Sequence, residues 1–259
     1  MKHSKIQKEL IKSLSNLKIK KGDTLFIHSN LNSLFKDYKI SLRDSIDILY
    51  DCLRKILGSK GTIVVPAYYY EYGFNDKAFD LNDSPISPEL GIFSKFMLSQ
   101  KKSQRSLNPI TSVVANGYNS KKICNMNTCS GYGIDSPFDV LTNLNAKMIF
   151  LGVDLRYMTY VHYVEFMVGV PHRYNKLFLK PVIRNKKKVN LPVISQVRHK
   201  NVISDSFGNN IKFERAKIVK KTKFNRSIIR SLDFKDVFTF LKKKLQKNIF
   251  YLLKEEPTL

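Results

Sequence analysis

The chain has 259 residues, of which 43% are hydrophobic, and it carries 45 Lys and Arg against 21 Asp and Glu, a net charge of +24. This length suffices for one sizeable core, and no apolar run approaches the length of a membrane span, which excludes a transmembrane protein. The charge argues against a polycationic substrate and favours polyanions such as nucleic acid, anionic lipid or phosphorylated small molecules. A lysine-rich genome composition would produce the same excess without any partner.

Three further observations narrow the class of protein. The first residues contain no apolar stretch resembling a signal peptide, so we expect a cytoplasmic protein. Cys52, Cys124 and Cys129 are odd in number, form no CxxC motif and have no histidines at metal-binding spacing, so we expect free thiols and no metal. No nucleic-acid module is recognisable, and the charge predicts at most weak, nonspecific binding to nucleic acid.

The N-terminal half predicts alternating helices and strands. Apolar residues at helical spacing predict helices over 4–17 and 42–57, with possible capping boxes at Ser4 and at Ser41 with Asp44. Short apolar runs at 24–27 and 61–66 predict buried strands, and a helix is expected over 89–99. We therefore expect an α/β fold over residues 1–259, a single-domain layered sandwich in which helices flank a central mixed sheet.

The C-terminal part predicts a β-rich extension over 178–230 and a terminal helix in 231–259. Strands are expected at 178–184, 189–197 and 211–217, with turns at 185–186 and 208–209. They would extend the sheet or form a flap over an acceptor pocket. An amphipathic pattern predicts a helix over 234–253, whose lysines either face solvent on a packed helix or contact a membrane surface or partner. The sequence leaves a homodimer open.

A strand, loop and helix over 147–171 is the place where chemistry is expected. The apolar run 148–153 leads to Asp154, and Thr159 occupies the N-cap position of a helix over 160–168. His162 and Glu165 are three residues apart on that helix, so their side chains can meet. A carboxylate and a helix dipole acting on one imidazole can leave a general base that titrates near neutrality. The alternative is a histidine packed among aromatic neighbours.

Two loops add candidate binding residues. The loop 67–74 follows a strand end, where open α/β sheets build sites, so Tyr70 can stack on a ring and Glu71 can bind an amine or hydroxyl. Half-buried tyrosines without a ligand are the alternative there. Arg105 and the small hydroxyl residues after it precede another strand and suit a phosphate or amide group.

Five stretches together resemble the aminoglycoside 3-N-acetyltransferase family. They are GDTLFIHSNLNSLF, GTIVVPAY, RSLNPITSVVANG, GYGIDSPFDVL and IFLGVDLRYMTYVHYVEF, in matching order and spacing over residues 20–175. The resemblance implies a single α/β domain that transfers an acyl group directly from acyl-CoA, either acetyl-CoA or 3-hydroxybutyryl-CoA, to a sugar amine without a metal. His162 would be the base, with Glu165 beside it and Thr159 shaping the turn. The implied acyl-CoA site consists of His28, Ser29, Asn30, Leu31, Arg105, Ser106, Ser112 and Val113.

One departure from the family pattern bears on which substrate is expected. Family members that modify aminoglycosides carry histidine where this chain has Asn108, which we keep as a candidate at the catalytic position although its amide cannot relay a proton. The net charge points the same way, and residues 161–178 resemble a branch of the family that acts on surface-polysaccharide sugars. Together these three features favour a nucleotide-linked amino sugar as substrate, such as a dTDP-aminodeoxyhexose used for O-antigen or capsule. The alternatives are an aminoglycoside acetyltransferase and a catalytically silent homologue. Expected acceptor contacts are Tyr70, Glu71, Asp154, His172, Arg173 and Tyr174, the last three at the phosphates unless they lie in a solvated loop.

Overall fold

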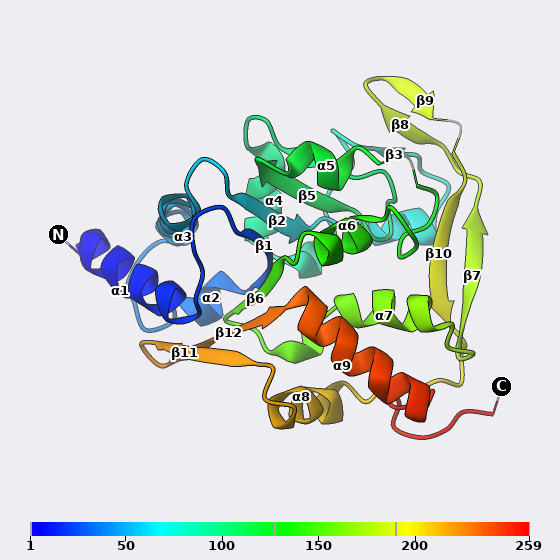
Figure 1. Cartoon of the computed structure of the whole chain (residues 1–259). Helices are drawn as coiled ribbons and strands as arrows, with labels where there is room; N and C mark the ends of the chain where they lie inside the picture. The colour runs from blue at the N-terminus through cyan, green and yellow to red at the C-terminus, as the bar shows by residue number, and fades with distance from the viewer. Residues whose placement is uncertain (1, 127, 190, 259) are drawn as a thin grey trace.

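A mixed sheet forms the centre of the molecule, seen here in a computed structural model that describes residues 2–126, 128–189 and 191–258 (Figure 1). β1 pairs in parallel with both β2 and β6, and the other neighbours in the sheet are antiparallel. The predicted α/β sandwich with a central mixed sheet is confirmed. In spatial order its strands are β11 (Lys220–Phe224), β12 (Ser227–Asp233), β6 (Lys147–Leu151), β1 (Thr24–Ser29), β2 (Thr62–Pro66), β5 (Val113–Gly117) and β4 (Gln104–Arg105).

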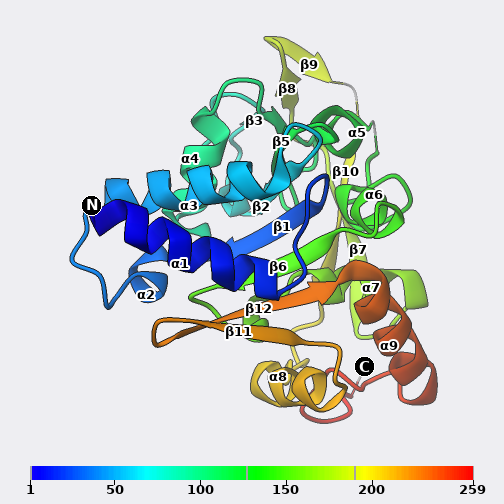
Figure 2. The ribbon, with the colours of Figure 1, turned by 60° about the vertical axis from the view of Figure 1, so that its left-hand side comes forward.

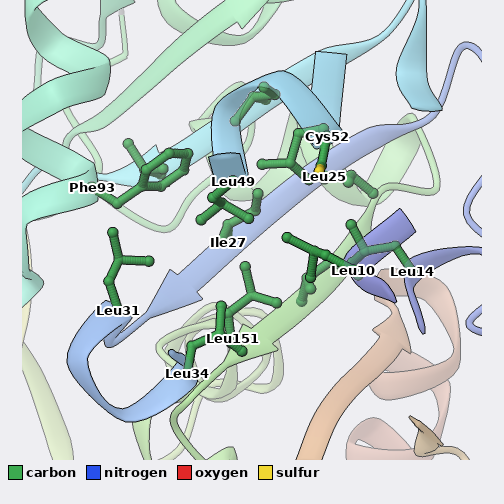
Figure 3. Close-up of a cluster of buried hydrophobic side chains, with 14 of the residues drawn as sticks. Leu10, Leu14, Leu25, Ile27, Leu31, Leu34, Leu49, Cys52, Phe93 and Leu151 are labelled. Carbon is green, nitrogen blue, oxygen red and sulfur yellow. The ribbon is translucent and has the colours of Figure 1, made fainter. Parts of the chain in front are cut away.

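Helices cover both faces of this sheet. Side chains along β1 alternate between the two faces, so that Leu25 and Ile27 enter one core cluster and Phe26 enters the other. The first cluster, shown in Figure 3, lies under α1 (Lys2–Asn16), α3 (Leu42–Leu57) and α4 (Ile92–Ser99). The second lies under α5 (Ser120–Cys124), α6 (Pro137–Asn143), α7 (Tyr160–Val168) and α9 (Phe234–Lys247).

The helices of the N-terminal half follow the sequence closely. The predicted helix 42–57 is confirmed at both ends, and Ser41 and Asp44 form the expected capping box. α1 begins at Lys2, so the capping box expected at Ser4 is wrong. The helix expected over 89–99 is divided into η2 (Pro88–Leu90) and α4, because Gly91 adopts a φ of 82° between them.

The C-terminal half departs further from the predicted elements. The strand expected at 211–217 is wrong, because α8 (Ser206–Arg215) occupies this region and the expected turn 208–209 lies inside the helix. Asp205 accepts a hydrogen bond from the Gly208 amide and so caps this helix. The turn at 185–186 is confirmed, with a positive φ at Asn185 and Lys186. Of the strand expected over 189–197, residue 190 lies outside the described residues.

The strands after α7 both extend the sheet and stand apart from it. β11 and β12 join the main sheet beside β6, whereas β7 (Arg173–Phe178) pairs only with β10 (Val193–Arg198) among the described strands. β8 (Val182–Arg184) joins β9 (Lys187–Val189) and β3 (Phe79–Asp80) in a third, small sheet. α9 ends at Lys247. It buries Val237, Leu241 and Leu245 against its own domain, which agrees with the alternative of a packed helix whose lysines face solvent.

Two close contacts fix the loops at the carboxyl end of the central strands. Gly152 follows β6 with a φ of 69°, and a Cβ atom there would lie 2.4 Å from the carbonyl oxygen of Asn30. The backbone of the β6 loop therefore touches the start of α2 (Leu31–Leu34). On the other side, Ser227 Oγ donates to the carbonyls of Ser33 (3.0 Å) and Leu34 (3.2 Å), which holds the β11–β12 turn against α2 (Figure 2).

Within the part of the chain that the structure describes, none of the helices combines the length and apolar character that a membrane crossing requires.

Candidate active site

A cavity of about 530 Å³ lies where β1, β2 and β6 end, and it is called the His162 cavity below. The ends of parallel strands are the usual position for a site in an open α/β sheet. Its wall is formed by the end of β1 and α2, by Pro66 at the end of β2 and Tyr70 beyond it, by the residues around Gly91, and by Val153, residues 156–159 and His162.

The predicted pairing of His162 with Glu165 is confirmed. Nδ1 of His162, in the first turn of α7, lies 2.7 Å from Oε2 of Glu165. The His162 side chain is 30% exposed and lines the cavity, whereas Glu165 is buried beneath it. The carboxylate thus faces the protein interior and the imidazole faces the ligand space.

Two further side chains complete a buried group called the Glu165 cluster: His162, Glu165, His172 and Arg173. Nε2 of His172 lies 3.0 Å from Oε1 of Glu165, and Nε of Arg173 lies 2.8 Å from Oε2. His172 is fully buried and Arg173 is 9% exposed at its side chain, so their expected contact with substrate phosphates is wrong. Gly169, in the left-handed conformation, ends α7 and starts the turn that brings both residues back to Glu165.

The residues that follow α7 in the sequence could have predicted this cluster. A glycine at the end of α7 followed by Pro171 predicts a sharp reversal of the chain. A buried carboxylate needs cationic or hydrogen-bonding partners, and His172 and Arg173 are the first such residues after the reversal.

The electrostatics of the cluster leave His162 as a neutral base. Burial opposes ionisation of Glu165, but the hydrogen bonds from His162 and His172 and the charge of Arg173 hold its pKa below the ordinary range. Burial and then the charge of Arg173 lower the pKa of His162 from 6.5, while Glu165 acts in the opposite direction. Because the ionised carboxylate accepts the proton on Nδ1, Nε2 carries the free lone pair at neutral pH.

Thr159 occupies the expected position but makes a different contact. Its backbone is already helical, with φ −70° and ψ −19°, and its side chain does not cap α7. Its Oγ1 instead accepts a hydrogen bond of 2.8 Å from the hydroxyl of the buried Tyr68. Thr159 therefore shapes the cavity wall next to His162 by fixing it to the loop after β2.

The four residues His28, Ser29, Asn30 and Leu31, expected at the acyl-CoA site, all line the cavity. The His28 ring stacks on Phe150 with centroids 5.1 Å apart, and burial lowers its pKa to about 3, so it is neutral. Asn30 Oδ1 accepts from the Ser33 amide and caps α2. The end of β1 thus offers uncharged polar groups to the ligand space.

The second predicted part of the acyl-CoA site lies elsewhere, in a group called the Arg105 cluster: Arg105, Ser106 and Ser112. Arg105 is buried, donates to the carbonyls of Ser84 (2.5 Å) and Ala67 (2.6 Å), and lies over the Phe79 ring. Ser106 Oγ accepts from the Val113 amide, Ser112 Oγ donates to the Ala67 carbonyl, and the Val113 side chain belongs to the core. None of these four predicted residues lines the His162 cavity, and Arg105 lines a separate pocket beside Gln104 and Arg184.

Asn108 is also a structural residue. Its Nδ2 donates to the carbonyls of Ile194 (3.0 Å) and Cys129 (3.3 Å), and its Oδ1 accepts from the amides of Ile110 and Thr111. The buried amide therefore uses its donors and its acceptor to join separate segments. It does not line the His162 cavity, which contradicts a catalytic position.

Of the remaining acceptor candidates, the structure brings Tyr70 to the cavity. Burial and the charge of Glu89 raise the pKa of its hydroxyl to about 12, so it stays protonated. Glu71 points away from the cavity to an exposed ion pair with Lys77 at 3.6 Å, and Tyr174 lies 43% exposed on β7. Asp154 pairs with Arg156 in a neighbouring pocket.

Three residues that were not predicted also line the cavity. Glu89 lies in η2, and Arg156 and Tyr157 lie in η3 (Leu155–Tyr157), 3-10 turns of three residues that are too short for a periodic pattern to mark a residue as facing a ligand. No group of three or more His, Cys, Asp or Glu is placed to hold a metal ion in the described residues.

Known proteins share both the sequence pattern and the fold. The family model described as aminoglycoside 3-N-acetyltransferase matches residues 26–246. The aminoglycoside N(3)-acetyltransferase IV of Salmonella sp. is 30% identical over 164 residues, which is 63% of this chain and 60% of that protein. A type III enzyme of Pseudomonas aeruginosa is 22% identical over 196 residues, 70% of each chain. The chain thus aligns with less than two thirds of the length of the Salmonella relative.

Solved structures confirm the architecture. The structure of AAC-IIIb binary with CoASH has a TM-score of 0.80 at 20% identity and covers 97% of this chain and 98% of its own. The room-temperature neutron and X-ray structure of sisomicin-bound AAC-VIa has a TM-score of 0.78 at 20% identity, covering 93% of this chain and 97% of its own. Since the family model spans most of the sequence and these structures share its fold, this chain belongs to the aminoglycoside 3-N-acetyltransferase family.

Proposed function

We propose that the protein is an N-acyltransferase that moves an acyl group from acyl-CoA to the amine of an amino sugar, with His162 as general base. The observation that carries this proposal is the contact of His162 with buried Glu165 at the wall of a cavity of about 530 Å³. An amine attacking a thioester must lose a proton, and a base with a lowered pKa is free to accept it at neutral pH.

The reaction runs in a single complex of both substrates. The amine nitrogen forms a bond to the thioester carbonyl carbon, and the carbon–sulfur bond breaks to release CoA. Nε2 of His162 takes the proton from the nitrogen and passes it to the departing thiolate. A placed base contributes about 10²–10⁴-fold to the rate, and holding both substrates in the cavity supplies much of the rest.

Glu165 orients the base rather than touching the substrate. Its carboxylate accepts from Nδ1 of His162, which selects the tautomer with a free Nε2 and stabilises the imidazolium that forms during transfer. His172 and Arg173 in turn hold the carboxylate from the buried side.

The donor fits the end of β1. His28, Ser29 and Asn30 present uncharged polar groups to the cavity, and a solved structure of the same fold was obtained with CoASH. Acetyl-CoA is the first donor to test, and 3-hydroxybutyryl-CoA is the second.

Two acceptors have separate support. The names of the relatives favour an aminoglycoside, which is the acceptor we propose first. The net charge of +24 favours an anionic acceptor, so a nucleotide-linked amino sugar is the second candidate.

Coenzyme A release tests the function directly. Both donors are combined with sisomicin or with a dTDP-aminodeoxyhexose, and thiol release is followed for the native protein, His162→Asn and a matched control, His199→Asn. His199 is exposed and does not line the cavity. We expect acceptor-dependent release that His162→Asn abolishes and His199→Asn preserves. No release with any acceptor, from protein that is folded and binds CoA, would contradict the proposed activity.

A further inference from the structure

A second pocket, called the basic pocket, adjoins the His162 cavity at the carboxyl end of β6. It encloses about 410 Å³, and its lining includes Lys36, Arg156, Arg226, Arg230 and Asp154. Asn30, Val153, Arg156 and Tyr157 line both spaces. A ligand that reaches His162 with one end can therefore extend into the basic pocket with the other.

The pocket is built by contacts between segments far apart in the sequence. Ser227 Oγ bonds the carbonyls of Ser33 and Leu34, so the β11–β12 turn is fixed beside α2 (Figure 2). Arg226 in this turn and Lys36 after α2 line the same pocket. Arg230 follows on β12 with its side chain 17% exposed. Arg156 is held opposite by Asp154 at 2.8 Å and lies over the Phe207 ring.

The charges remain positive after their partners are counted. Asp154 is paired with Arg156, Asp37 lies 3.4 Å from Arg226, and Glu214 lies 3.2 Å from Arg230. Glu214 is shared with Lys221, and Lys36 adds an exposed ammonium group. Guanidinium groups at one pocket suit the oxygens of a phosphate, to which arginine binds through two parallel hydrogen bonds.

We propose that the basic pocket binds the phosphate groups of a nucleotide whose reacting end lies at His162. The placement of the reacting end at His162 rests on the proposed acyl transfer. The binding of phosphate in the basic pocket does not. Two sources carry such phosphates: the nucleotide end of acyl-CoA, and the diphosphate of a nucleotide-linked amino sugar. An aminoglycoside carries no phosphate. If the pocket binds the diphosphate of the acceptor, it therefore favours nucleotide-linked amino sugars over aminoglycosides.

Calorimetric binding to the native protein and to variants of the pocket tests the proposal. The ligands are CoA, 3′-dephospho-CoA and dTDP, and the variants are Arg226→Gln and the double variant Arg226→Gln/Arg230→Gln. Arg226 is 79% exposed, and Glu214 keeps Lys221 when Arg230 is changed, so both variants are expected to fold. The matched control is Arg43→Gln, which removes an exposed arginine paired with an aspartate at 3.8 Å and lining neither space.

We expect the phosphate-bearing ligand to bind about threefold more weakly to Arg226→Gln and about tenfold more weakly to the double variant, with a loss that shrinks at high salt. Weaker CoA binding with dTDP unaffected assigns the pocket to the donor, and a loss that disappears with 3′-dephospho-CoA identifies the 3′-phosphate. Weaker dTDP binding with CoA unaffected assigns it to the acceptor, and weakening of both supports a phosphate site that the two ligands share.

Unchanged affinities in the variants, or no binding of CoA and dTDP to the native protein, would overturn the proposal. These outcomes are separate from failure of the acyl transfer, because binding is measured without turnover. If the protein releases no thiol but binds CoA through Arg226, the proposed activity is contradicted and the proposed phosphate site is supported.

Discussion

The Glu165 cluster and the Arg105 cluster are both buried and polar, yet they serve different ends. In the Arg105 cluster the guanidinium donates to carbonyls of the surrounding loops and no side chain reaches the His162 cavity. In the Glu165 cluster two histidines and an arginine meet one carboxylate, and one nitrogen of His162 is left facing the ligand space. A buried ionisable group points to chemistry when part of its cluster faces the reaction cavity, and to architecture when its hydrogen bonds end on backbone carbonyls.

The largest expected effect comes from a substitution in the Glu165 cluster. His162→Asn should lower kcat/KM by about 10²–10⁴-fold, because the amide cannot accept the amine proton. The melting temperature should stay near that of the native protein, since the side chain is partly exposed. Steady-state kinetics and thermal unfolding measure both, and retained activity would remove His162 from the role of base.

Arg105→Met should act on stability instead. The buried guanidinium would no longer donate to the Ser84 carbonyl, and the Ala67 carbonyl would keep only the hydrogen bond from Ser112, at a cost of about 2–4 kcal/mol in the free energy of unfolding. The value of kcat per folded molecule should be unchanged. Denaturant unfolding compared with Arg43→Met, at an exposed site, checks this prediction. A fall in kcat without a loss of stability would place Arg105 with the catalytic groups after all.

Asn108→His tests a position where histidine was expected in active family members. Imidazole cannot reproduce the four hydrogen bonds of the amide, so a loss of about 1–3 kcal/mol in stability is expected, with no gain in activity. Unfolding curves and kinetics of the same preparation give the answer. Higher activity in this variant would favour a catalytically silent native protein.

The smallest effect is a shift in pH dependence. The pKa of His162 lies below 6.5, so the acid limb of kcat/KM should fall only below that pH, as the base becomes protonated. Glu165→Gln removes the charge that raises this pKa, while Arg173, which lowers it, remains. The acid limb should therefore move to still lower pH, together with some loss of stability. A pH profile unchanged by the substitution would mean that His162 does not set the acid limb.

The same comparison shows how far the sequence leads. Periodicity and capping predicted α3 to both ends, and the spacing of His162 and Glu165 predicted their contact, because these depend on local geometry. The partners of Glu165 and the isolation of Arg105 depend on how loops pack, which no local pattern encodes. The resemblance grouped His28 to Leu31 with Arg105, but only His28 to Leu31 line the cavity.

The strand expected at 211–217 failed for a related reason. Apolar residues in this stretch fit either a short strand or one face of a helix, and Asp205 upstream decides for the helix by capping it. Short apolar runs need their flanking residues before their type can be assigned.

Gly152 lines the basic pocket, and its neighbours Asn30 and Val153 line both spaces. Because the β6 loop and α2 meet at Gly152 as bare backbone, with no room for a Cβ atom, a side chain at this position would push the two segments apart. Tyr70 and Glu89 line the His162 cavity, and Arg226 lines the basic pocket. Substitutions intended to change specificity therefore belong at such positions and not at Gly152.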